Sequence, residues 1–199
     1  MRYLVTVIVL AGLGLGCGGG TTVTRLDPNS THDLSGGWND VDARQTAEGL
    51  ILDCLTRTWH DNYAATHGGE RPKVTVGLIR NLTSEHIQME IIISDFEREL
   101  INSAKVRFVA SKEQRAEIRE ERWEQQEYAT RETAKKLRAE LGADFMLQGA
   151  FKQITDQAGK DRISFYQIDL EMVNIETMEK VWIGSQEIKK GITQGSRKW

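Results

Sequence analysis

The 199-residue sequence has no excess of positive charge and very little cysteine. Its 26 basic and 29 acidic residues leave a net charge of −3 at pH 7, so the composition gives no reason to expect a nucleic-acid partner. The two cysteines are Cys17, flanked by glycines, and Cys54, at an apolar position of a predicted helix. We therefore expect no disulfide between them, and we expect Cys54 to be a small buried hydrophobe.

The sequence also lacks a convergent set of reactive side chains. His60 and His67 are seven residues apart, a spacing that matches neither a helical pair nor a zinc motif, and we expect both in an exposed loop. Ser35 lacks the strand, turn and helix that surround a nucleophilic serine. Carboxylates alternate with the apolar face of a predicted helix, as solvated residues do; they are Glu90, Asp95, Glu97 and Glu99. We predict no catalytic residue, metal, cofactor or small-molecule substrate, and we disfavour an enzyme.

A glycine-rich stretch near the N-terminus, "VLAGLGLGCGGG", fits the G-x-G-x-x-G pattern of dinucleotide-binding loops. That pattern needs a helix directly after the glycines, because the helix N-terminus holds the pyrophosphate. No helical periodicity follows here. Instead, Arg2 precedes a short uncharged run, which is the layout of a secretory signal peptide and is too short to span a bilayer comfortably. We predict a signal peptide over residues 1–16.

The end of this run, Gly14-Leu15-Gly16-Cys17, resembles a bacterial lipobox. The resemblance implies that Cys17 is lipidated, with a diacylglycerol thioether and an N-acyl chain such as palmitate. Gly18, in place of an aspartate, implies an outer-membrane destination. Three acyl chains exceed the two signals that stable anchoring requires. The following residues are rich in Gly, Thr, Asn and Ser, so we expect 17–32 to be the acylated cysteine and a short flexible tether.

Helices and strands alternate through the middle of the chain. A helix is predicted from Val41 to about Thr58, capped by Asn39 or Asp40. Its apolar face comprises Ala43, Ala47, Leu50, Ile51, Cys54, Leu55 and Trp59. A strand follows over 73–81, with Val74, Val76 and Leu78 on one face and Ile79 on the other, which predicts cover on both sides.

A second helix presents Met89, Ile92, Ile93, Phe96 and Leu100 at helical spacing, and a strand follows over 105–110. Ser111 and Gln114 form a capping-box signature at the start of a long third helix that ends near residues 141–142. The next strand is "ADFMLQGAFKQI". The pattern β-α-β-α-β predicts a partly parallel sheet.

The C-terminal part reads as antiparallel strands. In "ISFYQIDLEMV", Tyr166, Ile168, Leu170 and Met172 alternate with polar residues, as in a half-buried strand. The last predicted strand is "KVWIGSQEI". We therefore predict a single α/β domain over 33–192, with a mixed parallel and antiparallel sheet flanked by helices, and a C-terminal tail over 193–199.

Two features suggest recognition of another protein. Trp38 follows two glycines and precedes the first helix, so it is either a lid folded onto the core or a docking anchor, and the lid is favoured. On the third helix, Arg115, Arg119 and Arg122 share one side and glutamates the other, with Ile118 and Trp123 between them. This helix is either a solvated, frayed segment or a docking surface for a carboxylate-rich partner.

Four phrases occur in an order that resembles the penicillin-binding-protein activator LpoB family, covering about Asp33 to Lys190. They are "DLSGGWNDVDARQTAEGLILDCL", "VTVGLIRNLTSEHI", "KVRFVAS" and "LGADFMLQGAFKQI". The core of the last phrase, "GADFMLQG", is less specific, because related TolB N-terminal-like and CsgG-like domains have similar sequences. The first phrase, with Trp38, Asn39 and Asp40, and the turn Arg80-Asn81-Leu82-Thr83 narrow the resemblance to the LpoB family. The best-known members carry a long disordered linker, but this chain has only the short segment 18–32.

The resemblance implies a TolB N-terminal-like fold and a lipid-anchored protein on the periplasmic side of the outer membrane. It also implies binding to the periplasmic accessory domain of a class A penicillin-binding protein, which would stimulate peptidoglycan synthesis and so affect cell shape. The candidate partner-binding residues are Trp38, Asn81, Arg115, Arg119, Arg122 and Trp123. The alternative is a non-enzymatic interaction module of an envelope assembly or secretion apparatus.

Overall fold

The computed structural model describes residues 22–28, 30–128 and 142–193. Residues up to Ser30 and residues from Thr31 onward form separate units. In the first, the Ser30 backbone N–H donates to the Asp27 carbonyl at 2.9 Å. The predicted signal peptide, Cys17 and most of the C-terminal tail lie outside the described residues.

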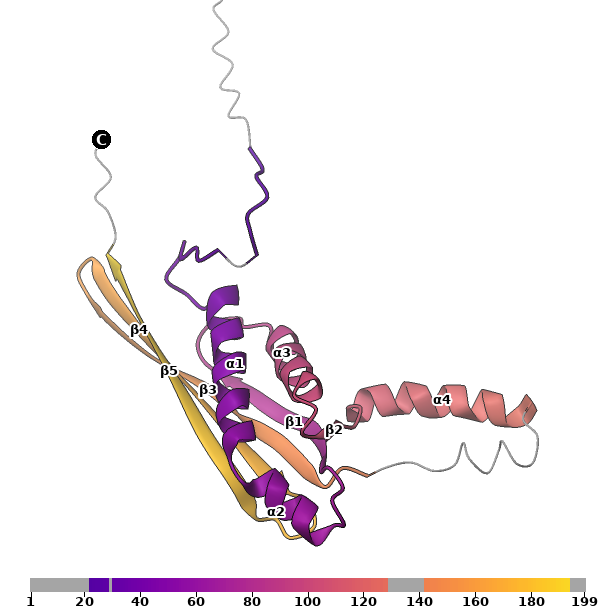
Figure 1. The fold of residues 1–199 in the computed structure, drawn as a ribbon. Coiled ribbons are helices and arrows are strands. Elements are labelled where there is room, and N and C mark those ends of the chain that lie inside the picture. The colour runs from indigo at the N-terminus through magenta and orange to yellow at the C-terminus, as the bar shows by residue number, and fades with distance from the viewer. Residues whose placement is uncertain (1–21, 29, 129–141, 194–199) are drawn as a thin grey trace, which may run out of the picture. The chain divides into compact units, whose positions relative to one another are not determined.

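The second unit is an α/β domain built on one five-stranded sheet (Figure 1). The strand order is β2-β1-β3-β4-β5. β1 is parallel to β2 and β3, and the remaining neighbours are antiparallel, so the predicted mixed sheet is confirmed. The elements are α1 (Asp40–Thr56), α2 (Trp59–Thr66), β1 (Lys73–Leu82), α3 (Met89–Asn102), β2 (Arg107–Phe108), α4 (Lys112–Tyr128), β3 (Phe145–Ala158), β4 (Asp161–Asn174) and β5 (Lys180–Thr193).

α1 has the apolar face that the sequence predicts. Asn39 is its N-cap, and its side chain accepts from the Asp42 backbone N–H while the Asp42 carboxylate accepts from the Asn39 N–H. The predicted apolar residues are all buried, and α1 and α3 pack side by side over the same face of the sheet (Figure 1). Cys54 is a free, fully buried thiol, as expected.

The helix ends two residues earlier than predicted, and an unexpected short helix, α2, begins at Trp59. The Trp59 indole N–H donates to the Cys54 carbonyl at 2.9 Å. His60 is 8% exposed, and its Nε2 lies 2.9 Å from the Leu55 carbonyl. The expectation of an exposed loop histidine is therefore wrong for His60, which folds back on the end of α1. His67 is exposed at the C-cap of α2.

β1 contains a bulge that the alternation pattern did not predict. Val76 pairs with Leu147, but Ile79 pairs with Gly149, so Gly77 and Leu78 together oppose one residue of β3. The extra residue reverses the alternation: Leu78 is 72% exposed, and Ile79 is 3% exposed. The predicted faces of Leu78 and Ile79 are therefore exchanged.

The predicted cover on both faces of the sheet is also wrong for the described residues. The face opposite α1 and α3 carries partly exposed polar side chains, such as Gln148, which donates to Glu171 at 2.8 Å. It also carries Ile183, which is 68% exposed. We call this the open face. Among the described residues, the hydrophobic core therefore lies on the side of the sheet that α1 and α3 cover.

β3 and β4 form a continuous hairpin from Phe145 opposite Asn174 to Ala158 opposite Asp161. The predicted inward residues of β4 are all buried; they are Tyr166, Ile168, Leu170 and Met172. α3 buries Ile92, Phe96 and Leu100, as predicted. The segment 105–110 contributes only the two-residue β2.

α4 begins at the predicted capping box. The Gln114 N–H donates to Ser111 Oγ at 3.3 Å, and the Ser111 N–H donates to the Gln114 side chain at 3.0 Å. The predicted end near residue 141 falls outside the described residues. Within the described ranges, none of the helices is long and apolar enough to cross a membrane.

The close approach of β3 and β4 at Gly149 gives a direct test of the hairpin. A Cβ atom at this position would lie 2.1 Å from the Asp169 carbonyl oxygen, which is backbone and cannot turn away. We expect Gly149→Ala to lower the free energy of unfolding by about 3 kcal/mol, measured by urea denaturation. Gly191→Ala in β5 meets no heavy atom within 4 Å and is the control, with an expected change below about 0.5 kcal/mol. Equal effects of the two variants would contradict this packing.

Candidate functional site

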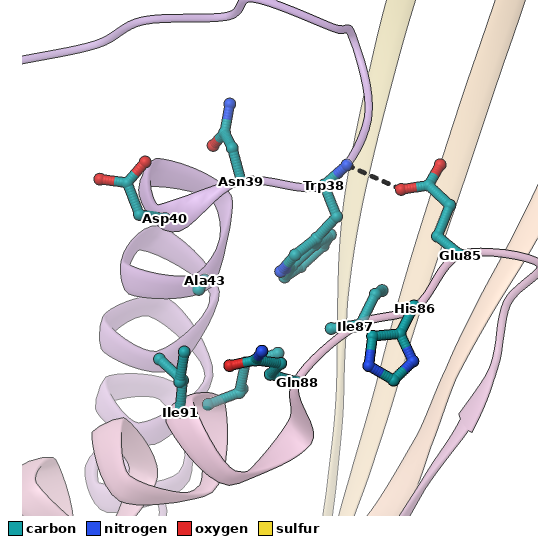
Figure 2. Close-up of a pocket in the computed structure, with 10 residues that line it drawn as sticks. Trp38, Asn39, Asp40, Ala43, Glu85, His86, Ile87, Gln88 and Ile91 are labelled. Atoms are coloured by element: carbon teal, nitrogen blue, oxygen red, sulfur yellow. Dashed lines mark hydrogen bonds between the residues drawn. The ribbon is translucent and has the colours of Figure 1, made fainter.

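A cavity of about 320 Å³ lies between the N-terminal ends of α1 and α3 and the loop that joins β1 to α3 (Figure 2). Its floor is apolar, and polar side chains stand at its rim. The lining residues are Trp38, Asn39, Asp40, Ala43, Glu85, His86, Ile87, Gln88, Ile91 and Ile92. Trp38, the last residue of the strap (residues 33–38), lines the cavity, so the geometry of the cavity depends on how this end of the strap is held.

Glycine allows the strap to lie close to the sheet. Gly36 has φ +66°, a conformation that L side chains rarely adopt. A Cβ atom there would lie 2.2 Å from Ile192 Cγ1 of β5. The Gly37 N–H then donates to the Ser35 hydroxyl at 3.2 Å. The first glycine of "SGGW" is therefore needed for the strap to lie this close to β5.

Lys190 of β5 holds the first half of the strap. Its Nζ donates to the Asp33 carboxylate at 2.8 Å and to the Gly37 carbonyl at 3.0 Å. It also pairs with the buried Asp42 of α1 at 2.5 Å. The hydrogen bond and charge of Lys190 hold the pKa of Asp33 below its ordinary value. One lysine thus joins the strap, α1 and β5.

Glu85 holds the second half of the strap. Its carboxylate accepts from the Trp38 backbone N–H at 2.9 Å, from Gln153 of β3 at 2.7 Å and from the Tyr166 hydroxyl of β4 at 2.5 Å. Arg162 lies 3.9 Å away. Burial raises the pKa of Glu85, but the three hydrogen bonds and Arg162 outweigh burial, so the pKa lies below its ordinary value. Burial, together with the hydrogen bond to Glu85, raises the pKa of the Tyr166 hydroxyl.

Trp38 and Asn81 are brought together around Glu85. The Trp38 ring packs edge-on against Phe151 at 5.3 Å and Tyr166 at 5.5 Å between centroids, and Figure 2 shows it between α1 and the loop of Ile87. The predicted lid is confirmed. Asn81 donates to the Glu85 carbonyl at 2.9 Å and accepts from Thr83. It therefore fixes the turn that presents Glu85.

The other candidate residues lie on α4, where no described side chain is buried. Trp123 is 72% exposed, and Arg119 is exposed, whereas Arg115 and Arg122 are partly exposed. The structure therefore places the six candidates in two groups, one around Glu85 and one on α4.

Sequence reasoning missed Glu85 and Lys190. One signal was available for Lys190, which shares the inward alternation of Trp182 and Ile188 in β5 and so points toward the helices. Glu85 carries no such signal, because it follows a turn. Across residues 22–28, 30–128 and 142–193, no group of three His, Cys, Asp or Glu side chains could hold a metal ion. The cavity can receive an apolar side chain at its floor and a hydrogen-bond donor at the Asp40 carboxylate.

One family model, described as the peptidoglycan-synthase activator LpoB, matches residues 42–188. No curated protein sequence matches this chain.

Three solved structures resemble the fold. The LpoB C-terminal domain from Salmonella enterica has 14% identity and a TM-score of 0.43, covering 73% of this chain and 97% of that one. Lipoprotein GNA1162 from Neisseria meningitidis has 17% identity and a TM-score of 0.39, covering 63% and 88%. The PelC dodecamer from Paraburkholderia phytofirmans has 17% identity and a TM-score of 0.34, covering 63% and 76%.

The depressed pKa of Glu85 makes stability depend on pH. A carboxyl whose pKa is lower in the folded chain stabilises the fold above the unfolded value, about 4.3, and this contribution is lost as the pH falls through the folded pKa. We expect Glu85→Gln to lower the free energy of unfolding near neutral pH by about 1–3 kcal/mol. We also expect its stability to fall less steeply than that of the wild type between about pH 5 and pH 3.

Urea denaturation across this pH range measures both effects. Glu90→Gln is the matched control, because Glu90 is exposed and its carboxylate accepts no hydrogen bond from the described residues. Its stability profile should follow the wild type. A Glu85→Gln profile that is parallel to the wild-type profile at acid pH would show that Glu85 does not carry this dependence.

Proposed function

Because the chain belongs to the peptidoglycan-synthase activator LpoB family, we propose that it binds a class A penicillin-binding protein and stimulates its peptidoglycan synthesis. The observation that carries the proposal is the extent of the family match. Residues 42–188 run from the first turn of α1 into β5, so the match covers the folded domain rather than one motif. In this role the chain regulates a synthase and performs no catalysis itself.

We also propose that the protein acts from a lipid anchor on the periplasmic face of the outer membrane. The support comes from the sequence, which predicts a signal peptide over 1–16 and has a lipobox-like segment that ends at Cys17, with Gly18 after it. A chain acylated at Cys17 would hold the domain near the membrane through the tether 17–32. At roughly 3.3 Å per residue this tether reaches about 50 Å when fully extended. Contact with a synthase therefore requires the synthase to approach the outer membrane.

For the docking surface, we propose the arginine side of α4 together with Trp123. Arginine and tryptophan are the residues that most often carry binding energy at interfaces. Like charges at i,i+3 and i,i+4 destabilise a solitary helix, and a carboxylate-rich partner surface would relieve the repulsion among Arg115, Arg119 and Arg122. Trp38 and Asn81 would contribute as positioning residues that shape the strap and the loop presented to the partner.

The activator role predicts a change in synthase activity. Adding the full chain to purified class A penicillin-binding proteins should capture at least one of them and raise its rate of glycan polymerisation. Replacing Arg115, Arg119 and Arg122 by Glu should abolish capture and stimulation while leaving the melting temperature nearly unchanged, because no described side chain of α4 is buried.

The matched control replaces Glu117, Glu120 and Glu121 by Lys, the same number of reversed charges on the same helix. It should keep its stimulation. Failure to capture any class A synthase would remove the activator proposal, whereas full stimulation by the arginine variant would remove only the docking surface.

The anchor proposal predicts labelling at one of two cysteines. In cells fed labelled palmitate, the wild-type chain should incorporate label and appear in the outer-membrane fraction. Cys17→Ser should lose the label and retain the signal peptide, which gel mobility detects. Cys54→Ala is the control and should keep the label, because Cys54 is fully buried. Equal labelling of the Cys17→Ser variant would contradict acylation at Cys17.

A further inference from the structure

The last strand of the sheet, β5, has an unpaired edge. β5 spans fourteen residues, Lys180–Thr193, and pairs with β4 along one side. It ends the strand order, and the described residues supply no backbone hydrogen bond to its other side. A long free edge presents a row of N–H and C=O groups that can pair with another strand. Such an edge is the usual place for strand addition.

The hydrogen bonds that join β5 to the strap and to α1 use side chains of β5 and, within the described residues, leave the backbone groups of its free edge unpaired. These side chains point to the helix-covered face, with Trp182 donating to Asp53 of α1 and Lys190 holding the strap. The alternate residues of β5 stand on the open face. Among them, Glu187 and Lys189 are exposed, and neither side chain makes an ion pair or hydrogen bond with another described residue.

We propose that β5 pairs antiparallel with β5 of a second copy of this chain, about a twofold axis at Ile188. In this register Glu187 stands opposite Lys189 of the second copy, and symmetry forms the same pair twice. Ile183 stands opposite Thr193, and on the helix-covered face Gly184 stands opposite Ile192. The two sheets join into one continuous sheet. This inference is independent of the proposed synthase partner.

Charge complementarity selects both the occupant and the register. Side chains alternate between the two faces of a strand, so a one-residue shift would put the helix-covered faces of the two copies on opposite sides of the joined sheet. The nearest alternative registers are therefore shifted by two residues. A shift in one direction places Glu187 opposite Glu187, and a shift in the other places Lys189 opposite Lys189. Directly opposed like charges are destabilising, and opposed unlike charges contribute about 0.2–1 kcal/mol each. Only the register centred on Ile188 satisfies both residues with a strand of the same sequence.

Oligomeric state is the first measurement. The full chain, purified in detergent because of its apolar N-terminal run, is studied by sedimentation velocity with the detergent contribution matched out. We expect a monomer–dimer equilibrium that shifts with protein concentration. A strict monomer up to about 1 mM, the range of weak complexes, would overturn the proposal, as would a dimer that is insensitive to the β5 variants below.

Charge exchange tests the register. Glu187→Lys and Lys189→Glu each create two like-charge pairs across the axis, and each should weaken the dimer about tenfold. The double exchange Glu187→Lys with Lys189→Glu restores unlike pairs and should return the dissociation constant to the wild-type range. Lys160→Glu, in the exposed turn between β3 and β4, carries the same change of net charge as Lys189→Glu and should have no effect. No recovery in the double variant would contradict the register.

Disulfide trapping tests the pairing directly, in a chain with Cys17→Ser and Cys54→Ala. Residues that stand opposite each other in an antiparallel pair have Cα atoms about 4.5–5.5 Å apart, which suits a disulfide. Glu187→Cys with Lys189→Cys should therefore give a covalent dimer on oxidation. Ser185→Cys with Glu187→Cys, a pair that would stand opposite only after two such register shifts, should give little. Equal trapping of the two pairs, or trapping of the second alone, would overturn the Ile188-centred arrangement.

Discussion

The carboxylate of Glu85 is the interaction on which the N-terminal part of the domain depends. It accepts hydrogen bonds from the strap, β3 and β4 at once. A carboxylate that is partly removed from water needs such donors, because an unpaired one costs several kcal/mol. The strap therefore has one low-energy position, with Trp38 over Phe151 and Tyr166. That position places Trp38 in the lining of the cavity. The contact between the strap and β5 is then made through Lys190.

The spacing of apolar residues along the sequence correctly predicted those helices and strands that bury one face and expose the other. In β4, every second residue from Tyr166 to Met172 is buried, and in α1 the seven predicted apolar residues are buried, counting Trp59 at the start of α2. Both patterns are fixed by a water-facing side and a core-facing side, which the sequence records directly. The caps at Asn39 and Ser111 were also predictable, because each uses partners within three residues.

The remainder depended on contacts between distant residues. Trp38 and Glu85 are 47 positions apart, and Tyr166 and Glu85 are 81 apart, so no local pattern marks Glu85 as a shared acceptor. The bulge at Gly77 and Leu78 arises from pairing with β3 and inverts an alternation that was regular up to that point. His60 is buried because its ring folds back and contacts the Leu55 carbonyl. The polarity of histidine by itself would have predicted an exposed side chain. The sequence thus predicted Trp38 and Asn81 as site residues, but it did not predict Glu85 and Lys190, the charged residues that hold the strap and its Trp38 in place.

The burial of Cys54 has a consequence for the exported, lipid-anchored chain that we propose. Burial raises the pKa of this thiol to about 12, and only the thiolate attacks disulfides or oxidants readily. In an oxidising compartment, a second reactive thiol on an exported chain invites scrambled crosslinks with other secreted proteins. Burial in the folded domain would leave Cys54 unreactive in such a compartment. A chain acylated at Cys17 as proposed would then present no reactive sulfur to its surroundings, and would need no oxidoreductase to reach its final form.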